Sequence, residues 1–246
     1  MKVQQYLKDT IGEKNAAFCV LIDPDKAAPE NLNGFLEKSK SLGVDALLVG
    51  SSILINDSFD QTVKNIQDRS DIPVILFPGS SNQVSSHADA ILFMSLISGR
   101  NPYLLFGDHV IAAPSIKNCG IEPIATGYIL IESGSVSATE FMSNTRPIPR
   151  NKPEIVFAHA LAASYLGMNT LYLEAGSGAN DTVPDEMISL VKNEVPVTLI
   201  VGGGIKKPET AAEKVRAGAD IVVIGTVLEN SWDEQLVSDF ARAIHE

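Results

Sequence analysis

The chain has 246 residues, a formal net charge of −11 and two cysteines. Its length is close to the ~250 residues of a single α/β barrel. The acidic balance argues against nucleic acid as a partner, because a phosphate backbone is bound by clustered lysine and arginine. We find neither an apolar run typical of a membrane span nor the apolar core of a signal peptide. Since the cysteines lack disulfide or zinc spacing, we expect a cytoplasmic protein.

Short aliphatic runs alternate with amphipathic stretches from one end of the chain to the other. Continuous aliphatic runs are typical of parallel strands that are covered by helices. Strands are predicted at 17–22, 46–49, 74–77, 90–94, 123–131, 170–173, 198–201 and 221–224. Helices are predicted near the start of the chain and at 29–42, 58–69, 101–113, 155–166, 185–192, 208–217 and 232–245. The segment 79–88 is short and polar, and no helix is predicted there.

Eight strands that alternate with helices favour a single (β/α)₈ TIM barrel, of the α/β class, over a doubly wound sheet. No G-x-G-x-x-G follows the first strand, so the dinucleotide-binding alternative lacks its fingerprint. No linker or shift in composition divides the chain, which predicts one domain over residues 1–246. Gly43, Gly167 and Gly218 each stand between a predicted helix and an aliphatic strand, where a left-handed residue commonly ends a helix.

Acidic and hydroxyl side chains follow the first two predicted strands. Asp23 shares its side-chain parity with Cys19 and Leu21, so we expect it to point into the barrel at the catalytic end. A hydroxyl at Ser52 would support a cation held mainly by Asp23 and ligand phosphates, as Mg²⁺ often is. The alternative for these residues is a turn or helix-capping role, and it weighs most for Asp25.

Tyr172 and Glu174 lie two residues apart on the sixth predicted strand, so both side chains project to the same face. A tyrosine beside a carboxylate at the top of a barrel can bind a hydroxyl and take its proton. The alternative is a purely structural tyrosine–glutamate hydrogen bond. Gly176 and Gly178 follow directly and open the backbone to a ligand, which favours the catalytic interpretation.

Glycines also follow the seventh and eighth strands. Gly203 and Gly204 lack side chains, so their backbone N–H groups can approach phosphate oxygens. Gly225 and Thr226 precede a helix start, where unpaired N–H groups favour an anion. The loops after strands 7 and 8 are the usual phosphate site of a (β/α)₈ barrel. Tight turns without a ligand are the alternative.

Several motifs in a fixed order carry a resemblance. They are Leu21-Ile-Asp-Pro-Asp-Lys26, Val49-Gly-Ser-Ser52, Ser95-Leu-Ile-Ser-Gly-Arg-Asn-Pro-Tyr103, Thr126-Gly-Tyr128, Tyr172-Leu-Glu-Ala-Gly-Ser-Gly-Ala179, Val201-Gly-Gly-Gly-Ile205 and Ile224-Gly-Thr226. With them the chain resembles the geranylgeranylglyceryl phosphate synthases, prenyltransferases on a modified TIM barrel, over nearly its whole length. The larger group, known from archaea and some bacteria, is more similar than the shorter heptaprenyl group, which carries lysine where this chain has Leu21. One departure is Gly107-Asp108-His109, where the family pattern has Gly-x-Gln.

The resemblance implies ether-lipid synthesis, in which the 3-hydroxyl of sn-glycerol 1-phosphate is alkylated by geranylgeranyl diphosphate and diphosphate is released. It also implies a Mg²⁺ ion held by Asp23 and Ser52, and a degenerate third helix. Glu174 would be the base, without a large pKa shift, and Tyr172 would orient the hydroxyl. The glycerol phosphate would lie against Tyr172, Leu173, Glu174, Ala175, Gly176, Ser177, Gly178, Gly203, Gly204, Gly225 and Thr226.

The prenyl chain needs an apolar groove, expected near strands 3–5. Candidates are Phe77, Tyr103, Phe106, Ile129 and Ile131, although ordinary core packing is the favoured interpretation for each one taken singly. Three other functions stay open: another phosphate-binding barrel isomerase or synthase, the same reaction with a different prenyl length, and a binding barrel without turnover.

Members of the family form dimers and hexamers, so a homo-oligomer is expected. Phe141, in the irregular segment after the fifth predicted strand, is a candidate interface aromatic. Neither the size of the oligomer nor the length of the prenyl chain follows from the residues. A transient contact with a membrane surface, at which the lipid substrate would be taken up, also stays open.

Overall fold

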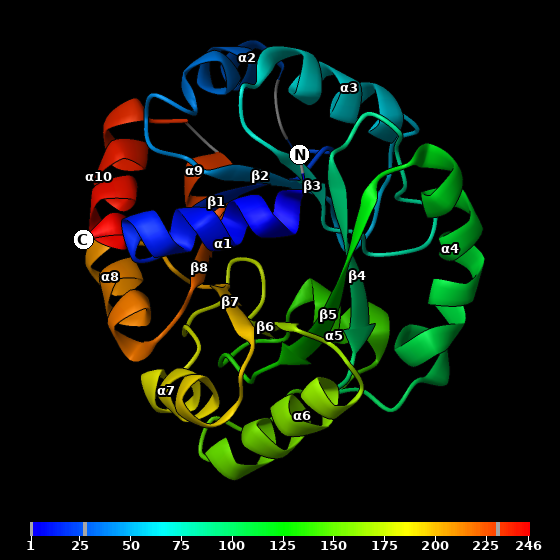
Figure 1. Ribbon diagram of the computed structural model, residues 1–246, viewed down its shortest axis with the longest axis vertical. Helices are drawn as coiled ribbons and strands as arrows, with labels where there is room; N and C mark the ends of the chain where they lie inside the picture. Colours follow the sequence, from blue (N-terminus) through cyan, green and yellow to red (C-terminus); the bar gives the residue numbers. More distant parts are fainter. Residues whose placement is uncertain (1, 27–28, 230–231) are drawn as a thin grey trace.

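Eight parallel strands close into a barrel in the computed structural model, which describes residues 2–26, 29–229 and 232–246 (Figure 1). Each strand pairs with its neighbour in sequence, and β1 pairs with β8 to complete the circle. The strands are β1 (Ala17–Ile22), β2 (Ala46–Val49), β3 (Val74–Leu76), β4 (Ala90–Leu96), β5 (Glu122–Leu130), β6 (Thr170–Glu174), β7 (Thr198–Gly202) and β8 (Ile221–Ile224). The predicted α/β barrel is confirmed.

Helices surround the barrel, and α1 lies across one of its ends (Figure 1). The described helices are α1 (Val3–Lys14), α2 (Pro29–Lys38), α3 (Phe59–Arg69), the π-helical turn η1 (Tyr103–Gly107), α4 (Asp108–Cys119), α5 (Ala138–Ser143), α6 (Pro153–Tyr165), α7 (Asp185–Glu194), α8 (Pro208–Ala217), α9 (Thr226–Glu229) and α10 (Glu234–His245). None of these helices has the length and apolar character needed to span a bilayer.

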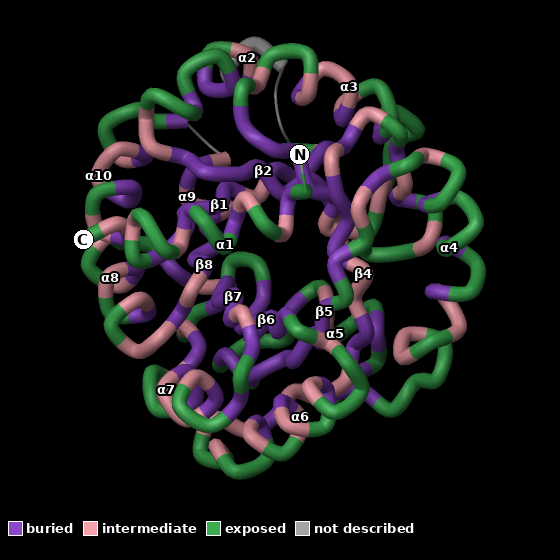
Figure 2. The backbone as a smooth tube through the Cα atoms, viewed as in Figure 1, coloured by how far each residue is buried: buried purple, intermediate pink, exposed green. Residues whose placement is uncertain are grey.

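The core has two layers because side chains alternate between the two faces of each strand. One layer fills the lumen, where Cys19, Leu48 and Tyr172 pack with Val3 and Leu7 of α1. The other layer lies between the strands and the surrounding helices. Figure 2 shows the buried residues along the strands and the exposed ones on the outer helix faces. Parity along a strand therefore decides whether a side chain can reach a ligand inside the barrel.

Element boundaries follow the predictions closely, with some differences. The connection between β3 and β4, residues 77–89, is described throughout and contains no helix, as the sequence predicts. The predicted helix 29–42 ends earlier, at Lys38, and Gly43 adopts its positive φ of 88° in the turn that follows. The predicted helix 101–113 begins as the π-helical turn η1 and extends to Cys119. The helix α5, inside the segment expected to be irregular, is not predicted.

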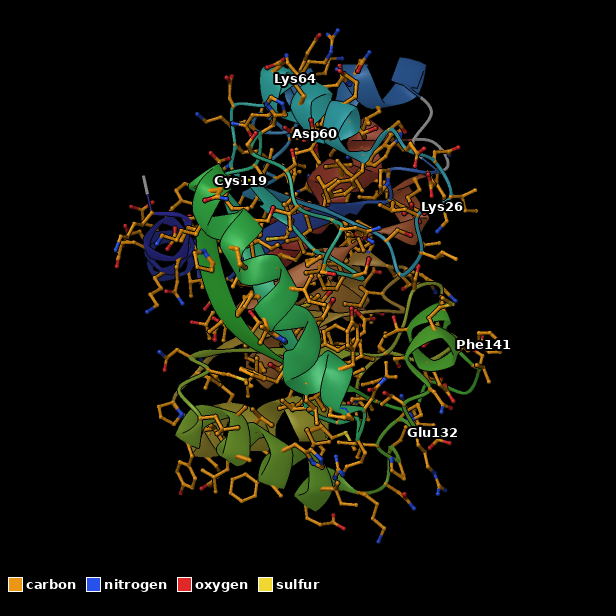
Figure 3. All side chains as sticks on the ribbon, turned by 90° about the vertical axis from the view of Figure 1, so that its right-hand side faces the viewer. Lys26, Asp60, Lys64, Cys119, Glu132 and Phe141 are labelled. Atoms are coloured by element: carbon orange, nitrogen blue, oxygen red, sulfur yellow. The ribbon has the colours of Figure 1, made fainter. Side chains whose placement is uncertain are left out.

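Carboxylates, one buried and two partly buried, tie the strand beginnings together at the α1 end of the barrel. Asp45, Asp89 and Asp220 each precede a strand and accept a hydrogen bond from a backbone N–H of the strand before it. This end is closed by α1 and has the character of a stability face. Lys26 and Phe141 lie on the side of the barrel away from the dark blue α1 (Figure 3). The open end, formed by the carboxyl ends of the strands, is thus left for ligands.

Candidate functional site

A cavity of about 900 Å³ opens at the carboxyl ends of the strands. This volume lies within the range of small-molecule sites. Loops after most strands contribute to its wall, and α5 covers part of it with Ala138, Thr139, Met142 and Ser143. The predicted site residues in its lining are Asp23, Ser52, Tyr172, Glu174, Ser177, Gly178, Gly203, Gly204, Gly225 and Thr226. Leu173, Ala175 and Gly176 are not in the lining, so the structure brings most, but not all, of the predicted residues together.

Tyr172 and Glu174 lie at the carboxyl end of β6, and both side chains face the lumen, as their parity predicts. Both are almost completely buried. The Tyr172 ring stacks on Phe77 with centroids 5.1 Å apart, and the Gly176 N–H donates to Glu174 Oε1 at 2.5 Å. The tyrosine ring and the carboxylate are thus held in one orientation. By contrast, Leu173 packs between the sheet and the helices, so only its backbone can contribute to the cavity.

Burial raises the pKa of Glu174 to about 7, and N–H groups of Gly176 and Ala175 with the Tyr172 hydroxyl oppose that rise. Burial and the nearby charge of Glu174 raise the pKa of Tyr172 well above its ordinary value. Tyr172 is therefore a neutral hydrogen-bonding group near neutral pH, and Glu174 titrates there. The sequence-based hypothesis is that Glu174 can act as the base without a large pKa shift, and the structure adds that its pKa is raised, because its carboxylate is desolvated.

The loops after β6 and β7 contain glycines in a left-handed conformation. Gly176, Gly178, Gly203 and Gly204 have φ of 106°, 68°, 85° and 71°. A Cβ at Gly203 would overlap with Glu174 Oε1, and one at Gly204 would lie 2.8 Å from the Asp181 carbonyl oxygen. Glycine is therefore required by both conformation and space. Of these glycines, Gly178, Gly203 and Gly204 line the cavity, near the carboxylate of Glu174.

After β8, Gly225 and Thr226 lead into α9, which is a single turn. A helix this short contributes little macrodipole, so an anion here would be bound by the unpaired N–H groups of its first turn. The Thr226 hydroxyl lies 3.0 Å from Ser177 Oγ, which joins the β8 loop to the β6 loop across the cavity. The two loops thus form one polar wall.

A change at Gly204 gives an expected result. If the ligand is the glycerol phosphate that the family resemblance implies, Gly204→Ala should weaken its binding about tenfold, because a non-glycine residue costs roughly 1–2 kcal/mol in this conformation and the loop must move. Gly167 is a matched control, since its φ is 85° and a Cβ there would meet nothing within 4 Å. Calorimetric titration of both variants checks the assignment, and equal affinities would contradict it.

Asp23 points into the cavity, as predicted, but its hydroxyl neighbour differs from the predicted one. Ser51 Oγ donates to Asp23 Oδ2 at 3.2 Å, and Lys26 Nζ lies 2.9 Å from the same oxygen. The Ser52 hydroxyl lies 3.3 Å from Thr139 Oγ1 of α5 instead. Parity does not settle such a choice, because the strand has ended and the chain turns at these serines.

Asp25 has a structural role in a turn, which is the alternative that the sequence leaves open. Its carboxylate accepts the N–H of Ile55 at 2.7 Å and the side-chain amide of Asn56 at 2.8 Å. These hydrogen bonds hold its pKa below the ordinary value. Asp25 thus connects the loop after β1 to the loop after β2, and so helps to position Asp23.

The apolar wall of the cavity lies near strands β3–β5, as predicted, but most of its side chains are not the named candidates. Of the five candidates, Phe77 lines the cavity, together with Met94, Leu96, Leu104 and Tyr128. The other four do not line it, and for Ile129 and Ile131 the favoured interpretation, ordinary core packing, is confirmed. The side chains of Ile129 and Ile131 pack in the outer layer, and those of Tyr103 and Phe106 are largely exposed on η1. The π-helical turn rotates Leu104 toward the lumen, and no sequence pattern announces such a turn.

The departure at His109 lies outside the cavity lining. This side chain is buried on α4, with its Nε2 3.2 Å from Ser95 Oγ and its ring edge-on to Phe93. It therefore fastens α4 to the outer face of β4.

Glu229 and Tyr128 also line the cavity, and the sequence-based interpretation gives neither of them a role. Glu229 ends α9 with a buried side chain and lies 3.9 Å from Lys26, which follows β1. Tyr128 is part of a motif named above, but no role is predicted for it. In the structure it pairs in register with Tyr172 on the neighbouring strand. The alternation of side chains along β5 could have predicted that Tyr128 points into the lumen. The contact between Lys26 and Glu229 could not have been predicted in this way, because the two residues lie near opposite ends of the sequence.

Comparisons with known proteins agree with this arrangement. The model of the PcrB family matches residues 8–244. A geranylgeranylglyceryl phosphate synthase of Pyrococcus horikoshii is 46% identical over 231 residues, which are 94% of this chain and 90% of that protein. One of Chitinophaga pinensis is 44% identical over 229 residues, 93% of this chain and 90% of its own.

A solved structure is similar as well. It is the (S)-3-O-geranylgeranylglyceryl phosphate synthase of Thermoplasma acidophilum in complex with its substrate sn-glycerol-1-phosphate. It superposes with a TM-score of 0.90 at 33% identity, covering 97% of both chains. The length of these matches, together with the barrel and its glycine loops, shows that the chain belongs to the PcrB family.

Proposed function

We propose that this protein joins the 3-hydroxyl of sn-glycerol 1-phosphate to geranylgeranyl diphosphate through an ether bond and releases diphosphate. The observation that carries the proposal is the buried Tyr172–Glu174 pair, which lies directly beside the left-handed glycines of the β6 and β7 loops. A phosphate on the loops and a hydroxyl at the pair would be two ends of one small acceptor. The apolar side chains across the cavity match the chemistry of a prenyl chain.

In the proposed reaction the C–O bond of the allylic diphosphate breaks, and diphosphate leaves with the electron pair. The acceptor oxygen attacks the same carbon, and its proton passes to a carboxylate oxygen of Glu174. Tyr172 orients the acceptor hydroxyl by a hydrogen bond. Holding the reactants in contact supplies much of the rate, since a bound pair reacts as if at very high concentration.

The acceptor phosphate would be bound by backbone N–H groups of Gly203, Gly204, Gly225 and Thr226. Such groups bind an anion without a positive side chain, which is consistent with the net charge of −11. Ser177 and Thr226 add hydroxyls to the same wall. The geometry favours an acceptor with a phosphate at one end over a nucleotide, because the polar wall is one small patch beside the base.

A Mg²⁺ ion is part of the proposal. When bound, it would neutralise the diphosphate and assist its departure as a Lewis acid. Asp23 fits such an ion, since its carboxylate lies in the cavity beside a hydroxyl and already attracts the Lys26 ammonium. In the described part of the chain no three His, Cys, Asp or Glu residues gather in metal-ligand geometry. That suits a cation held mostly by phosphates. We assign Asp23 and Ser52 to it, with Ser51 as the competing hydroxyl.

The Asp23→Asn variant should need more Mg²⁺ for half-maximal product formation, by about tenfold or more, because a charged ligand is replaced by a neutral one. Product formed against Mg²⁺ concentration is the measurement. Asp68→Asn is a matched control, since Asp68 is exposed, pairs with Lys64 and lies outside the cavity lining. An unchanged Mg²⁺ titration for Asp23→Asn would remove Asp23 from the metal site, and Ser51→Ala beside Ser52→Ala tells which hydroxyl contributes.

Mass spectrometry of products from sn-glycerol 1-phosphate and a mixed pool of prenyl diphosphates tests the function. We expect a prenyl ether of glycerol phosphate, with the C20 chain preferred, because geranylgeranyl diphosphate is the donor in the proposal. A different chain length would keep the reaction and change the donor. The absence of any ether would favour another phosphate-binding barrel enzyme.

We further propose a cytoplasmic homo-oligomer. The support is the exposed apolar surface on two helices, with Phe141 and Met142 on α5 and Tyr165 at the end of α6. Light scattering of the purified protein measures the mass directly, and the mass of a single chain would contradict the oligomer. A transient contact with a membrane surface is tested separately, by sedimentation with lipid vesicles.

A further inference from the structure

Lys26 lies between two carboxylates at the edge of the cavity. Its Nζ is 2.9 Å from Asp23 Oδ2 and 3.9 Å from Glu229 Oε2. The two carboxylates are nearly buried, with side-chain exposures of 10% and 8%, whereas the lysine side chain is 55% exposed. All three residues line the cavity. A long, half-exposed side chain anchored by buried acids can turn toward a ligand at small cost.

The charges in the cavity wall make this lysine unusual. Its described lining contains the carboxylates of Asp23, Asp25, Glu174 and Glu229, and the ammonium groups of Lys26 and Lys206. An anion is repelled by such a wall unless a cation is placed beside it. Lys206 follows the glycine loop after β7, next to the proposed acceptor phosphate. Lys26 follows β1, next to Asp23, and is the cation available on that side.

The environment keeps Lys26 charged. Its ammonium lies within ion-pair distance of two nearly buried carboxylates, those of Asp23 and Glu229. Glu229 is itself desolvated, which raises its pKa, and Lys26 opposes that rise. In the described structure Lys26 is the ion-pair partner of Glu229. A buried carboxylate at this place therefore has a clear use, which is to hold the lysine.

We propose that Lys26 binds the diphosphate of the prenyl substrate and that Glu229 is a positioning residue that holds Lys26 at this place. The inference rests on the proposed function for the identity of the donor. An ammonium supplies charge-assisted hydrogen bonds to phosphate oxygens and leaves the glycine loops to the acceptor. Lys26 follows β1 and Glu229 ends α9, which follows β8, and the two are neighbours only because the barrel closes. The diphosphate would thus lie on the Asp23 side of the cavity.

Titration calorimetry with inorganic diphosphate, in buffer with Mg²⁺, tests the proposal. Lys26→Ala should weaken diphosphate binding about tenfold or more, since a charge-assisted hydrogen bond contributes that much. Its affinity for sn-glycerol 1-phosphate, titrated separately, should stay within about twofold, as expected for an exposed substitution. Lys26→Arg should keep most of the diphosphate affinity, and Lys117→Ala on α4 removes the same charge outside the cavity and should change neither affinity.

Glu229→Gln should weaken diphosphate binding less than Lys26→Ala does. Added to Lys26→Ala, it should have no further effect, because the two residues would act through one contact. Unchanged diphosphate affinity in Lys26→Ala, or an equal loss of both ligands, would overturn the proposal. So would independent, additive effects of the two substitutions. If the wild type forms no ether product but Lys26→Ala still loses diphosphate, the proposed function fails and the role of Lys26 stands.

Discussion

Glu174→Gln is expected to lower turnover by a factor of roughly 10²–10⁴, the usual contribution of a positioned base. Glutamine has the shape of glutamate but cannot accept the proton of the acceptor hydroxyl. Binding of sn-glycerol 1-phosphate should change little, because its phosphate would be held by the loops after β6, β7 and β8. Single-turnover product formation and calorimetry together separate the two effects.

The pH profile gives a second readout of the same residue. Burial raises the pKa of Glu174 to about 7, so the base form is lost as the pH falls through that value. We therefore expect kcat/KM to rise with pH through about 7 and then to level off. The Tyr172 hydroxyl lowers the pKa of Glu174, so Tyr172→Phe should move this limb to higher pH. If the pH dependence of kcat/KM were the same in Tyr172→Phe as in the wild type, Tyr172 would not affect the pKa of the base.

Glu186→Gln is the matched control for this experiment. Glu186 lies in the first turn of α7, at the outer surface and away from the cavity. Its substitution by glutamine removes the same charge as Glu174→Gln does. Its turnover should equal that of the wild type. If Glu174→Gln turned over equally well, Glu174 would not be the base, and the pair with Tyr172 would be structural.

Asp45→Ala is expected to cause a large loss of stability. The Asp45 carboxylate is buried and accepts three hydrogen bonds: from Lys14 Nζ at 2.6 Å, the Phe18 N–H at 2.8 Å and His245 Nε2 at 2.9 Å. It thus joins α1 and α10, the first and last helices, to the start of the sheet. Removing one partner of a buried pair costs 3–5 kcal/mol, and partial exposure of Lys14 places the expected loss near ~3 kcal/mol.

For a chain of this length the loss corresponds to a fall in Tm of about 6–12 °C, measured by calorimetry. Asp68→Ala removes an exposed pair with Lys64 and should change Tm little. At a temperature where Asp45→Ala is folded, its turnover should match the wild type, because Asp45 lies at the end of the barrel opposite the cavity. A Tm equal to that of the wild type would show that the three contacts contribute nothing.

The direction of the pH dependence follows from the depressed pKa of Asp45. Burial works against its charged form, but the hydrogen bonds from His245, Lys14 and Phe18 outweigh it and lower the pKa. The stabilisation is therefore present above the unfolded pKa of about 4 and is lost as the pH falls through the folded value. The difference in Tm between wild type and Asp45→Ala should be constant near neutral pH and shrink in acid.

Much of the barrel could be predicted because its signals are local. The aliphatic runs identify the strands, and β1, β2 and β8 have the predicted bounds. Strand parity also places Asp23, Tyr172 and Glu174 in the lumen, because alternation is a property of the strand itself. Where the chain leaves regular structure this reasoning ends. The serines after β2, the turn η1 and the helix α5 are among the places at which the predictions and the structure differ.

The sequence by itself determined the order of the strands, the parity of the side chains at the lumen and the glycines that a phosphate loop requires, since each depends on residues a few positions apart. Only the tertiary structure decided which groups meet across the barrel. The contact of Lys26 with Glu229, the cover that α5 forms and the raised pKa of Glu174 are examples. They depend on closure of β1 against β8 and on desolvation, which are properties of the assembled barrel and of no single segment.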